Sequence, residues 1–243
     1  MRTIRIFAVS DIHGHAGLLE RALTSAGFEV GNENHLLVGC GDYFDRGVEN
    51  VEVLELLTAI PNKVLVRGNH EDMLERALYR RRLSATDVYN GTDVTVESFF
   101  GAQSIDPNGE LVLDEKIKQR VLAFTGGTVN FFETERFVFV HGWIPLEYEE
   151  AGLRVREDWR DAPEEDWGRA RFLEWHKLYG LGLGVPGKRV VCGHRSAAYA
   201  CRFDDTREER DTQPFWGDGM VAIDSGTVRS GRVHVLVVED GVN

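Results

Sequence analysis

The sequence of 243 residues predicts an α/β fold built on a parallel β-sheet. Two observations lead to this prediction. Apolar, β-branched runs alternate three times with helix-type segments before residue 84, and each run ends in a short polar loop. Strands that alternate with helices in this way form βαβ units, whose helical crossovers make neighbouring strands parallel. An apolar content of 42% is ample for the core of such a domain.

Each of the three units joins one apolar run to one helix-type segment. In the first unit, the apolar residues between Leu18 and Ala26 recur at helical spacing, and Gly27 is a stop signal. The second helix is expected to stop near Pro61. We therefore predict strands at 4–9, 35–40 and 63–68, and helices at 16–26, 51–60 and 72–83.

The pattern changes in the second half of the chain. The periodicity weakens after residue 83, and we interpret about 83–130 as a small, partly irregular cap insertion within a single domain of residues 1–243. Two short strands are expected around "ETE" at 133–135, and a charged segment spans 147–180. The run "KRVVCGH" predicts another strand. The runs "MVAIDSG" and "RVHVLVVED" predict a closing β-hairpin.

Charge and cysteine content narrow the class of protein. The formal net charge is −12, which would repel a polyanion, so no nucleic-acid partner is expected. Cys40, Cys192 and Cys201 are odd in number and lack Cys-x-x-Cys spacing, which is typical of reduced thiols in a cytoplasmic protein. The N-terminal stretch "MRTIRIFAVSDIHG" has no cleavage site and no long apolar span, so no membrane partner is expected. The sequence leaves the oligomeric state open.

Side chains that bind metals or transfer protons follow five of the predicted strands. In chain order they are Asp11 and His13, Asp42 and Asp45, Asn69 and His70, His141, and His194. Each alone has an ordinary structural explanation, such as a turn aspartate, a helix cap or a core histidine. In an open α/β sheet, however, the loops beyond the carboxyl ends of the strands converge on one crevice. Five coincidences of this kind favour a single functional site.

The residue types in this set indicate a metal centre. Carboxylate, imidazole and amide oxygen together suit manganese, iron or zinc, and no cysteine stands near these loop tips to form a thiolate site. The donors are too many for one tetrahedral site, and one aspartate can bridge two ions roughly 3.5–4 Å apart. Such a pair would lower the pKa of a shared water to about 7 or below and supply hydroxide for attack at phosphorus. The set therefore predicts hydrolysis of a phosphate ester.

Five motifs resemble, in order and in approximate spacing, the signatures of a known family. They are "DIHGH" at 11–15, "GDYFDRG" at 41–47, "RGNHE" at 67–71, "VHGW" at 140–143 and "CGHR" at 192–195. This set is similar to that of the calcineurin-like metallophosphoesterases, and specifically of the phosphoprotein phosphatase branch that includes bacterial and phage serine/threonine phosphatases. The resemblance is dense over about residues 4–75. It implies an α/β sandwich of sheets flanked by helices, with the metal site at the carboxyl ends of the strands.

The resemblance also implies a role for each residue of the set. One metal ion would be bound by Asp11, His13 and Asp42, and the other by Asp42, Asn69, His141 and His194, with Asp42 as the bridge. His70 would be the general acid that protonates the leaving oxygen, and Asp45 would orient it. Arg46 would clamp the phosphate through its planar guanidinium. Two divalent ions are expected, manganese first, with iron or zinc as alternatives.

Some positions leave a choice open or depart from the family. A second phosphate-binding arginine is expected between the last two histidines of the motifs, and Arg169 in "WGR" is preferred to Arg160. Trp143 is expected to narrow the mouth of the site or to stack on a leaving group. Ser196 stands where nuclease-like relatives have a second histidine, which favours the phosphoprotein phosphatase branch.

The sequence therefore predicts a two-metal phosphomonoester hydrolase, most specifically a serine/threonine protein phosphatase that uses a metal-bridging hydroxide and a histidine general acid. Its substrate would be a phosphoprotein or a small phosphoester. A symmetrical dinucleoside-polyphosphate hydrolase shares the motifs and is the alternative, but the acidic residues of 147–180 would repel a tetraphosphate unless they face away from the metals. A non-catalytic binding module is disfavoured because every expected ligand type is present.

Overall fold

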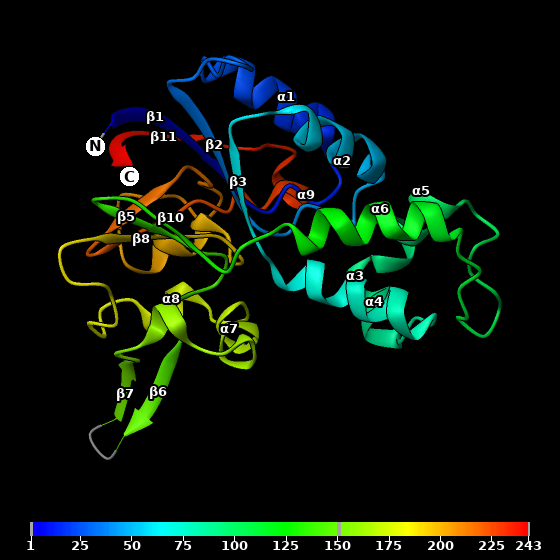
Figure 1. Ribbon diagram of the computed structural model, residues 1–243. Helices are drawn as coiled ribbons and strands as arrows, with labels where there is room; N and C mark the ends of the chain where they lie inside the picture. Colours follow the sequence, from blue (N-terminus) through cyan, green and yellow to red (C-terminus); the bar gives the residue numbers. More distant parts are fainter. Residues whose placement is uncertain (1, 150–151, 243) are drawn as a thin grey trace.

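In the computed structural model, which describes residues 2–149 and 152–242, two β-sheets pack face to face. Helices cover the outer face of each sheet, and the two ends of the chain lie side by side at one edge, as Figure 1 shows. The predicted α/β sandwich of sheets flanked by helices is confirmed.

The first sheet has four strands in the order β11-β1-β2-β3. Three of them are parallel, and β11 runs antiparallel to β1 at the edge. The strands are β1 (Arg2–Val9), β2 (His35–Cys40), β3 (Lys63–Val66) and β11 (Leu236–Val242). The helices that follow the parallel strands are α1 (Ala16–Ser25), α2 (Asn50–Ala59) and α3 (Asn69–Arg80). The three predicted β-loop-α units are therefore confirmed.

The second sheet has five strands in the order β4-β5-β8-β10-β9, parallel in the middle and antiparallel at both edges. The strands are β4 (Phe132–Glu133), β5 (Phe137–Phe139), β8 (Arg189–Cys192), β9 (Phe215–Gly217) and β10 (Met220–Ala222). The segment between β5 and β8 contains a separate two-stranded sheet and the outer helices. Its elements are β6 (Leu146–Glu149), β7 (Gly152–Val155), the 3₁₀ turn Trp159–Asp161, α7 (Glu164–Ala170) and α8 (Trp175–Leu178). A 3₁₀ segment, Ala197–Arg202, follows β8.

The central strands are apolar along their whole length because both of their faces are buried. In β1, Ile4 and Ile6 point into the core between the sheets, whereas Phe7 and Val9 point into the core under the helices. The second sheet alternates in the same way, with Phe139 facing the first sheet. Each sheet therefore holds its loops rigidly from two sides, which suits loops that carry functional groups.

The segment 83–130 is more helical than expected. It forms α4 (Ala85–Asn90), α5 (Thr92–Phe100) and α6 (Glu115–Gly126), which contact α2 and α3. The N-caps are clear, since Ser84 accepts the amide of Asp87 and Asp114 accepts the amides of the first helical turn of α6. The short helices end at Gly91 and Gly101, both with positive φ, so no apolar period lasts long enough to be recognised.

The predicted closing hairpin is wrong. β10 lies in the second sheet and β11 in the first, and α9 (Thr227–Ser230) lies between them in the chain. The antiparallel partner of β10 is β9, and that of β11 is β1. Two consecutive strand-like runs thus belong to different layers, because the chain crosses from one sheet to the other after β10. No helix in the described parts of the chain is long and apolar enough to cross a membrane.

Candidate metal centre and active site

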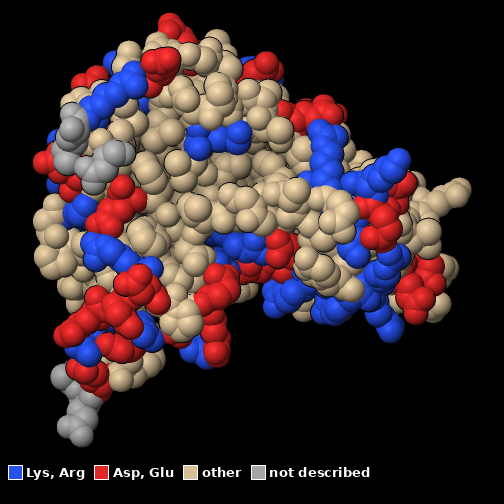
Figure 2. Space-filling view, viewed as in Figure 1, with Lys and Arg blue, Asp and Glu red and all other residues tan. Residues whose placement is uncertain are grey.

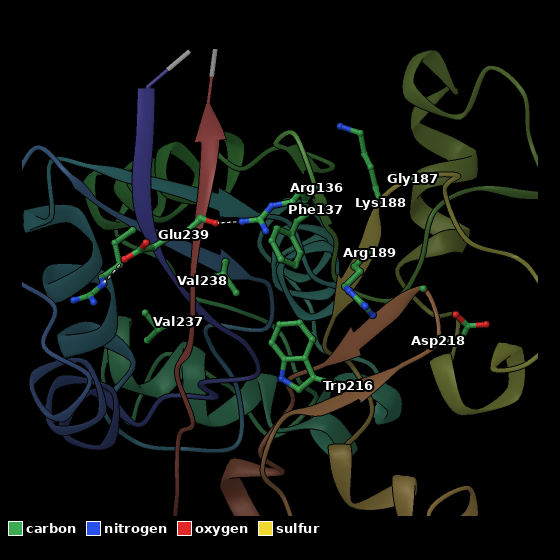
Figure 3. A pocket seen from close by; sticks show the side chains of 12 residues that line it. Arg136, Phe137, Gly187, Lys188, Arg189, Trp216, Asp218, Val237, Val238 and Glu239 are labelled. Carbon is green, nitrogen blue, oxygen red and sulfur yellow. Dashed lines mark hydrogen bonds and ion pairs between the residues drawn. The ribbon is translucent and has the colours of Figure 1, made fainter.

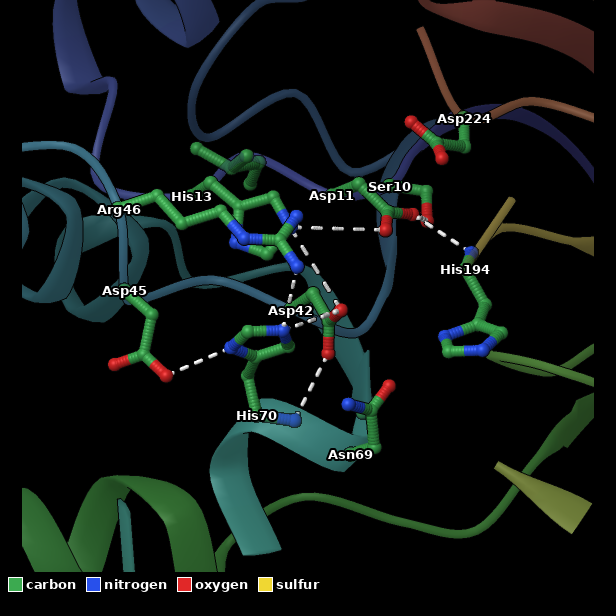
Figure 4. A network of polar contacts seen from close by, with 12 residues as sticks. Ser10, Asp11, His13, Asp42, Asp45, Arg46, Asn69, His70, His194 and Asp224 are labelled. Carbon is green, nitrogen blue, oxygen red and sulfur yellow. Dashed lines mark hydrogen bonds and ion pairs between the residues drawn. The ribbon is translucent and has the colours of Figure 1, made fainter. Parts of the chain in front are cut away.

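The polar loops at the carboxyl ends of five strands meet at one place in the structure. They follow β1, β2, β3, β5 and β8. Because β1, β2 and β3 are parallel to one another, as are β5 and β8, the carboxyl ends of these strands lie at the same edge of each sheet. Figure 4 shows most of the predicted side chains pointing toward one another there. The structure thus brings together Asp11, His13, Asp42, Asp45, Arg46, Asn69, His70, His141 and His194.

The backbone of these loops is held in an uncommon conformation. Among the described residues, seven that are not glycine have positive φ, and six of them belong to the predicted site. Those six are Asp11, His13, Asp42, Asp45, Arg46 and His194. Left-handed residues cost on the order of 1–3 kcal/mol each and gather where function requires a particular side-chain direction. Gly41 has the same sign of φ and no room for a side chain, since a Cβ there would lie 2.7 Å from Nδ1 of His141.

Asp42 is the centre of the arrangement. Its Oδ2 lies 3.8 Å from Nε2 of His13 and 3.7 Å from Nε2 of His70, and its Oδ1 lies 3.3 Å from Nε2 of His141. Two groups of residues place their ligand atoms close enough to hold a metal ion, His13 with Asp42 and His70, and Asp42 with His141 and His194. Asp42 is common to both, which is the geometry that a bridging carboxylate requires.

Backbone carbonyl groups fix which ring nitrogen of two histidines faces the cavity. Nδ1 of His13 donates to the carbonyl of Phe44 at 2.9 Å, and Nδ1 of His141 donates to the carbonyl of Cys40 at 2.8 Å. The lone pair of each neutral ring is therefore on Nε2, the nitrogen that points toward Asp42. This second hydrogen bond is typical of metal-binding histidines. Asn69 is part of the same group, with Oδ1 2.9 Å from Nε2 of His141.

Asp11, which follows β1 of the first sheet, completes the donor set and contacts the loop that follows β8 of the second sheet. Its Oδ2 accepts the amide of His194 at 2.9 Å and the hydroxyl of Ser10, while Oδ1 lies 3.9 Å from Nε2 of His13. Burial raises the pKa of Asp11 to about 6. Burial acts in the same direction on Asp42, but His141 and His70 outweigh it and hold the pKa of Asp42 well below its usual range.

This donor set fits divalent cations. Two buried carboxylates stand among imidazole nitrogens and an amide oxygen, with no thiolate within the two candidate groups. A buried carboxylate is costly unless it is paired, and a cation at this point would neutralise Asp11 and Asp42 together. Oxygen and imidazole donors suit manganese, iron or zinc.

His70 differs from His13 and His141 because its Nδ1 bonds to a carboxylate and not to a backbone carbonyl group. Its Nδ1 donates to Oδ2 of Asp45 at 2.7 Å, which leaves Nε2 facing the cavity. Asp45 is fully buried and is held by two hydroxyl groups of α5, Thr92 at 2.9 Å and Thr95 at 2.6 Å. Burial acts to lower the pKa of His70, but the charges of Asp42 and Asp45 outweigh it and raise this pKa above its usual value. The ring is thus disposed to carry a proton at Nε2.

Arg46 extends across the floor of the site. Its guanidinium lies 2.9 Å from Nε2 of His13 and 3.1 Å from Nε2 of His70, as Figure 4 shows, and it donates to each ring while that nitrogen carries no proton. The side chain lies in a cavity of about 470 Å³ that also contains Asp42, Asn69, His70 and His194. The cavity is walled by α3 and α4 and is open to solvent on one side.

Two residues of the site were not identified from the sequence. Glu71 is fully buried, and its carboxylate accepts the amides of Gly68 at 2.8 Å, Asp42 at 3.0 Å and Tyr43 at 2.9 Å. It therefore holds the β2 loop against the start of α3. Asp224, in "IDSG", is buried behind Asp11, and its pKa is raised by burial and then by Asp11.

Other sequence predictions do not coincide with the site. Trp143 is buried in the core of the second sheet, where Nε1 donates to the carbonyl of Leu183, so the prediction that it narrows the mouth is wrong. Phe172 stands at the cavity wall instead. Arg169 is exposed on α7 and is paired with Asp166 at 3.0 Å, and it does not line the cavity. Arg160 is paired with Glu133 at 2.7 Å. The second phosphate-binding arginine remains a prediction without structural support.

A second hollow lies at the opposite end of the strands. It has a volume of about 780 Å³ and is lined by residues at the start of β5 and β8, including Phe137 and Arg189, together with Trp216 (Figure 3). It contains none of the predicted residues. The carboxyl-end cavity is therefore the candidate active site, because the metal-type donors and the His70–Asp45 pair are found there.

Comparison with solved structures agrees with this fold. A candidate diadenosine tetraphosphatase has a TM-score of 0.57 at 17% identity, covering 98% of this chain and 94% of that one. A metallophosphoesterase from Sphaerobacter thermophilus has a TM-score of 0.52 at 15% identity, covering 99% and 89%. At such low identity these likenesses concern the fold alone.

Comparison with related sequences identifies the protein family. Serine/threonine-protein phosphatase 2 of Salmonella typhimurium is 44% identical over an alignment of 196 residues, and the match covers 76% of this chain and 80% of that protein. The family model of the calcineurin-like phosphoesterases matches residues 4–216, a span that contains every predicted metal ligand. The chain belongs to the calcineurin-like phosphoesterase family.

Proposed function

We propose that this protein is a two-metal phosphomonoesterase that removes phosphate from phosphoserine and phosphothreonine in proteins. The observation that carries the proposal is the meeting of Asp42, His70 and Arg46 on the floor of one cavity. This reaction needs a carboxylate that can hold two cations, together with a proton donor and a bidentate donor that both reach the same phosphate. The 44% identity to a serine/threonine-protein phosphatase supports this substrate class.

The metal-binding roles combine the geometry around Asp42 with the ligand set that the family resemblance implies, in which Asp11 takes the place of His70 beside His13 and Asp42. Asp11, His13 and Asp42 would hold one divalent ion, and Asp42, Asn69, His141 and His194 would hold the other. We propose manganese for both positions. When bound, the two ions would supply a nucleophile from water at neutral pH and neutralise charge on the phosphate. The carbonyl groups of Phe44 and Cys40 keep Nε2 of His13 and His141 free for these roles.

The remaining residues act on the phosphate itself. Arg46 would turn its two guanidinium nitrogens, which lie beside His13 and His70 in this structure, toward the non-bridging oxygens of the substrate. His70 would donate the proton on Nε2 to the leaving oxygen of serine or threonine. Asp45 keeps Nδ1 of His70 protonated and stabilises the positive charge of the ring before the transfer.

One observation keeps a second candidate function open, the symmetrical hydrolysis of dinucleoside polyphosphates. The acidic residues of 147–180 were expected to repel a tetraphosphate, but Phe172 alone of that segment is among the residues that line the described cavity. The β6–β7 hairpin, which carries two of these acids, Glu147 and Glu149, projects away from the body of the molecule (Figure 1). The charge argument against the dinucleotide is therefore weaker, and it now rests on Glu164 and Glu165, which line an adjacent hollow together with Arg76 and Phe172.

The deciding experiment compares three substrates after metal removal and reloading with manganese, iron or zinc. We expect a phosphopeptide and an aryl phosphate to be hydrolysed well and a dinucleoside tetraphosphate poorly. The measurement is kcat/KM for each substrate with each metal. A clear preference for the dinucleotide would replace the proposed function with the second candidate, and activity without any divalent ion would contradict the metal assignment.

A further inference from the structure

One face of α3 forms a wall of the active-site cavity. The helix begins at Asn69 and His70, and Met73, Arg76 and Arg80 line the cavity farther along. Their spacing of three and four residues places them on one side of the helix. With a rise of 1.5 Å per residue, Arg76 stands about 9 Å and Arg80 about 15 Å along the axis from His70. The helix therefore extends from the reacting phosphate to positions that only a larger substrate would reach.

The charge of this wall differs from that of the whole chain. The cavity is lined by four arginines, Arg46, Arg76, Arg80 and Arg195, against two carboxylates, Asp42 and Asp87, whereas the chain carries a net charge of −12. Figure 2 shows Lys and Arg side chains gathered around α3 and α4, and acidic side chains around the hairpin at the lower left. The site is thus a local basic region on an acidic protein.

Arg76 is the arginine of this wall with a free guanidinium end. Its Nε donates to the carbonyl of Asp72 at 3.1 Å, and it forms no ion pair with any residue that the structure describes. Arg80 is exposed and donates to Oδ2 of Asp87 at 2.7 Å, which leaves its other nitrogens accessible. Arg195, across the cavity, is held by Glu174 through Nε at 2.7 Å. Of the arginines outside the catalytic floor, Arg76 therefore has the most capacity for a new anionic partner.

We propose that Arg76, with Arg80 behind it, forms a subsite for a second anionic group of the substrate, and that this group is an acidic side chain near the phosphorylated residue. An extended peptide advances about 3.3–3.6 Å per residue, so distances of about 9–15 Å correspond to roughly three or four residues. Exposed Phe172, on the opposite wall, provides an apolar surface beside this path. The inference rests on the proposed action on phosphoproteins and specifies which sequences are preferred.

The test compares phosphopeptides that differ in one flanking residue. Matched peptides carry Glu, Gln or Lys three or four residues from the phosphoserine, on either side, and kcat/KM is measured for each. We expect the Glu peptide on one side to exceed the Gln peptide by about three- to tenfold, the range of one or two exposed ion pairs. The preference should shrink as salt is raised, because exposed charges are screened.

Three variants test whether Arg76 is responsible for the preference for the Glu peptide. Arg76→Ala should sharply reduce the preference for the Glu peptide over the Gln peptide, with Arg80 accounting for what remains, and Arg76→Glu should reverse the order in favour of the Lys peptide. Arg120→Ala is the matched control, since it removes an exposed arginine of α6 that does not line the cavity, and it should leave the preference intact. Thermal unfolding of each variant establishes that it is folded. An unchanged preference in Arg76→Ala would overturn the subsite.

The outcomes separate this inference from the function on which it rests. Turnover of an aryl phosphate without turnover of any phosphopeptide would overturn the proposed function, and the assignment of an acidic side chain with it. Equal rates on Glu and Gln peptides would leave the proposed function standing and overturn the subsite. A dinucleoside tetraphosphate that is preferred by the natural protein and loses its advantage in Arg76→Ala would identify the second anionic group as phosphate, against the acidic side chain.

Discussion

At the scale of single residues, Asp42 stands between two sets of nitrogen donors. Its two carboxylate oxygens face different histidines, with His13 and His70 near Oδ2 and His141 near Oδ1. Glu71 accepts the backbone amide of Asp42, and the loop holds Asp42 at a φ of 57°. The direction of this side chain is therefore fixed by neighbours before any ion binds, which is the condition for a precise bridging ligand.

We expect Asp42→Asn to lower the amount of bound metal and to abolish turnover, because one carboxylate would serve both ions. Elemental analysis of the purified, manganese-loaded variant measures the first effect. Asp218→Asn is the control, since Asp218 is exposed and lines the hollow at the opposite end of the strands. Metal content equal to that of the natural protein would mean that Asp42 has a structural role alone.

A second prediction at this scale concerns the proton held by His70. His70→Asn should slow an alkyl phosphate by about 10²–10⁴-fold and an aryl phosphate much less, because a phenolate leaves with less need of a proton. The measurement is kcat on both substrates at saturating manganese. An equal loss on the two would remove His70 from the role of general acid. Asp45→Asn should give the same pattern in weaker form.

At the scale of elements, the sequence predicted the strands and the loops that carry the site, for a physical reason. Strands buried on both faces appear as continuous apolar runs, and the polar residues that end them stand next to one another in the chain. The residues that hold the site in place could not be recognised in this way, because they are distant in the sequence from the residues that they contact. Thr95 contacts Asp45 across 50 positions, and Asp42 contacts Glu71 across 29, so neither role is visible as a local pattern.

The sequence predictions that differ from the structure also depend on contacts between distant parts of the chain. β10 and β11 each look like one half of a hairpin, but the sheet that each strand joins is decided by packing in three dimensions. Trp143 was placed at the mouth because it follows His141, yet its indole fills an apolar core on the other side of the strand. The cap was expected to be partly irregular because its helices α4 and α5 are short and each ends at a glycine. In each case the local sequence left two arrangements open.

α5 provides a prediction about an element that touches no substrate. Its two threonines are the hydroxyl donors to Asp45, so Thr95→Val removes one donor while keeping the shape of the side chain. We expect a loss of roughly 10-fold or more on an alkyl phosphate, by analogy with the 10–100-fold effects of residues that orient metal ligands. The aryl phosphate should be affected less.

The control for this prediction is Thr125→Val on α6. Thr125 is also a buried threonine, and its hydroxyl donates to Glu75, away from the catalytic pair. Both variants are expected to lose some stability, but the ratio of alkyl to aryl rates should change in Thr95→Val alone. The same ratio in both variants would show that α5 contributes stability and does not position Asp45.

At the scale of the whole molecule, the core between the sheets connects the two halves of the chain. Ile6 and Val38 from the first sheet pack with Phe139 and Val191 from the second. The candidate metal site also takes ligands from both sheets. We therefore propose that residues 1–243 form a single domain that includes segment 83–130, and that it unfolds in one cooperative transition.

A buried carboxylate links the edges of the two sheets. Asp240 on β11 accepts hydrogen bonds from the hydroxyl of Thr134 at 2.6 Å, from the amide of Arg136 at 2.8 Å and from Nε of Arg136 at 2.9 Å. Thr134 and Arg136 lie between β4 and β5, two paired strands of the second sheet. Burial acts to raise the pKa of Asp240, but these hydrogen bonds outweigh it and hold the pKa below its usual value of 3.8. Folding therefore favours the charged carboxylate of Asp240, and the hydrogen bonds that connect the two sheets depend on this charged form.

The sign of the pH effect follows from this lowered pKa. Above the unfolded value of about 3.8 the contribution of Asp240 to stability is fully present, and it is lost as the pH falls through the lower folded value. Asp240→Asn should therefore lower the free energy of unfolding at pH 7 by on the order of 1–3 kcal/mol, and the difference from the natural protein should shrink below pH 4.

Urea unfolding of the metal-free protein across this pH range measures both the free energy of unfolding and its dependence on pH, with Glu20→Gln on the exposed face of α1 as the control. A difference that stayed constant with pH would show that the charge of Asp240 is not what joins the sheets, and two separate transitions would contradict the single domain.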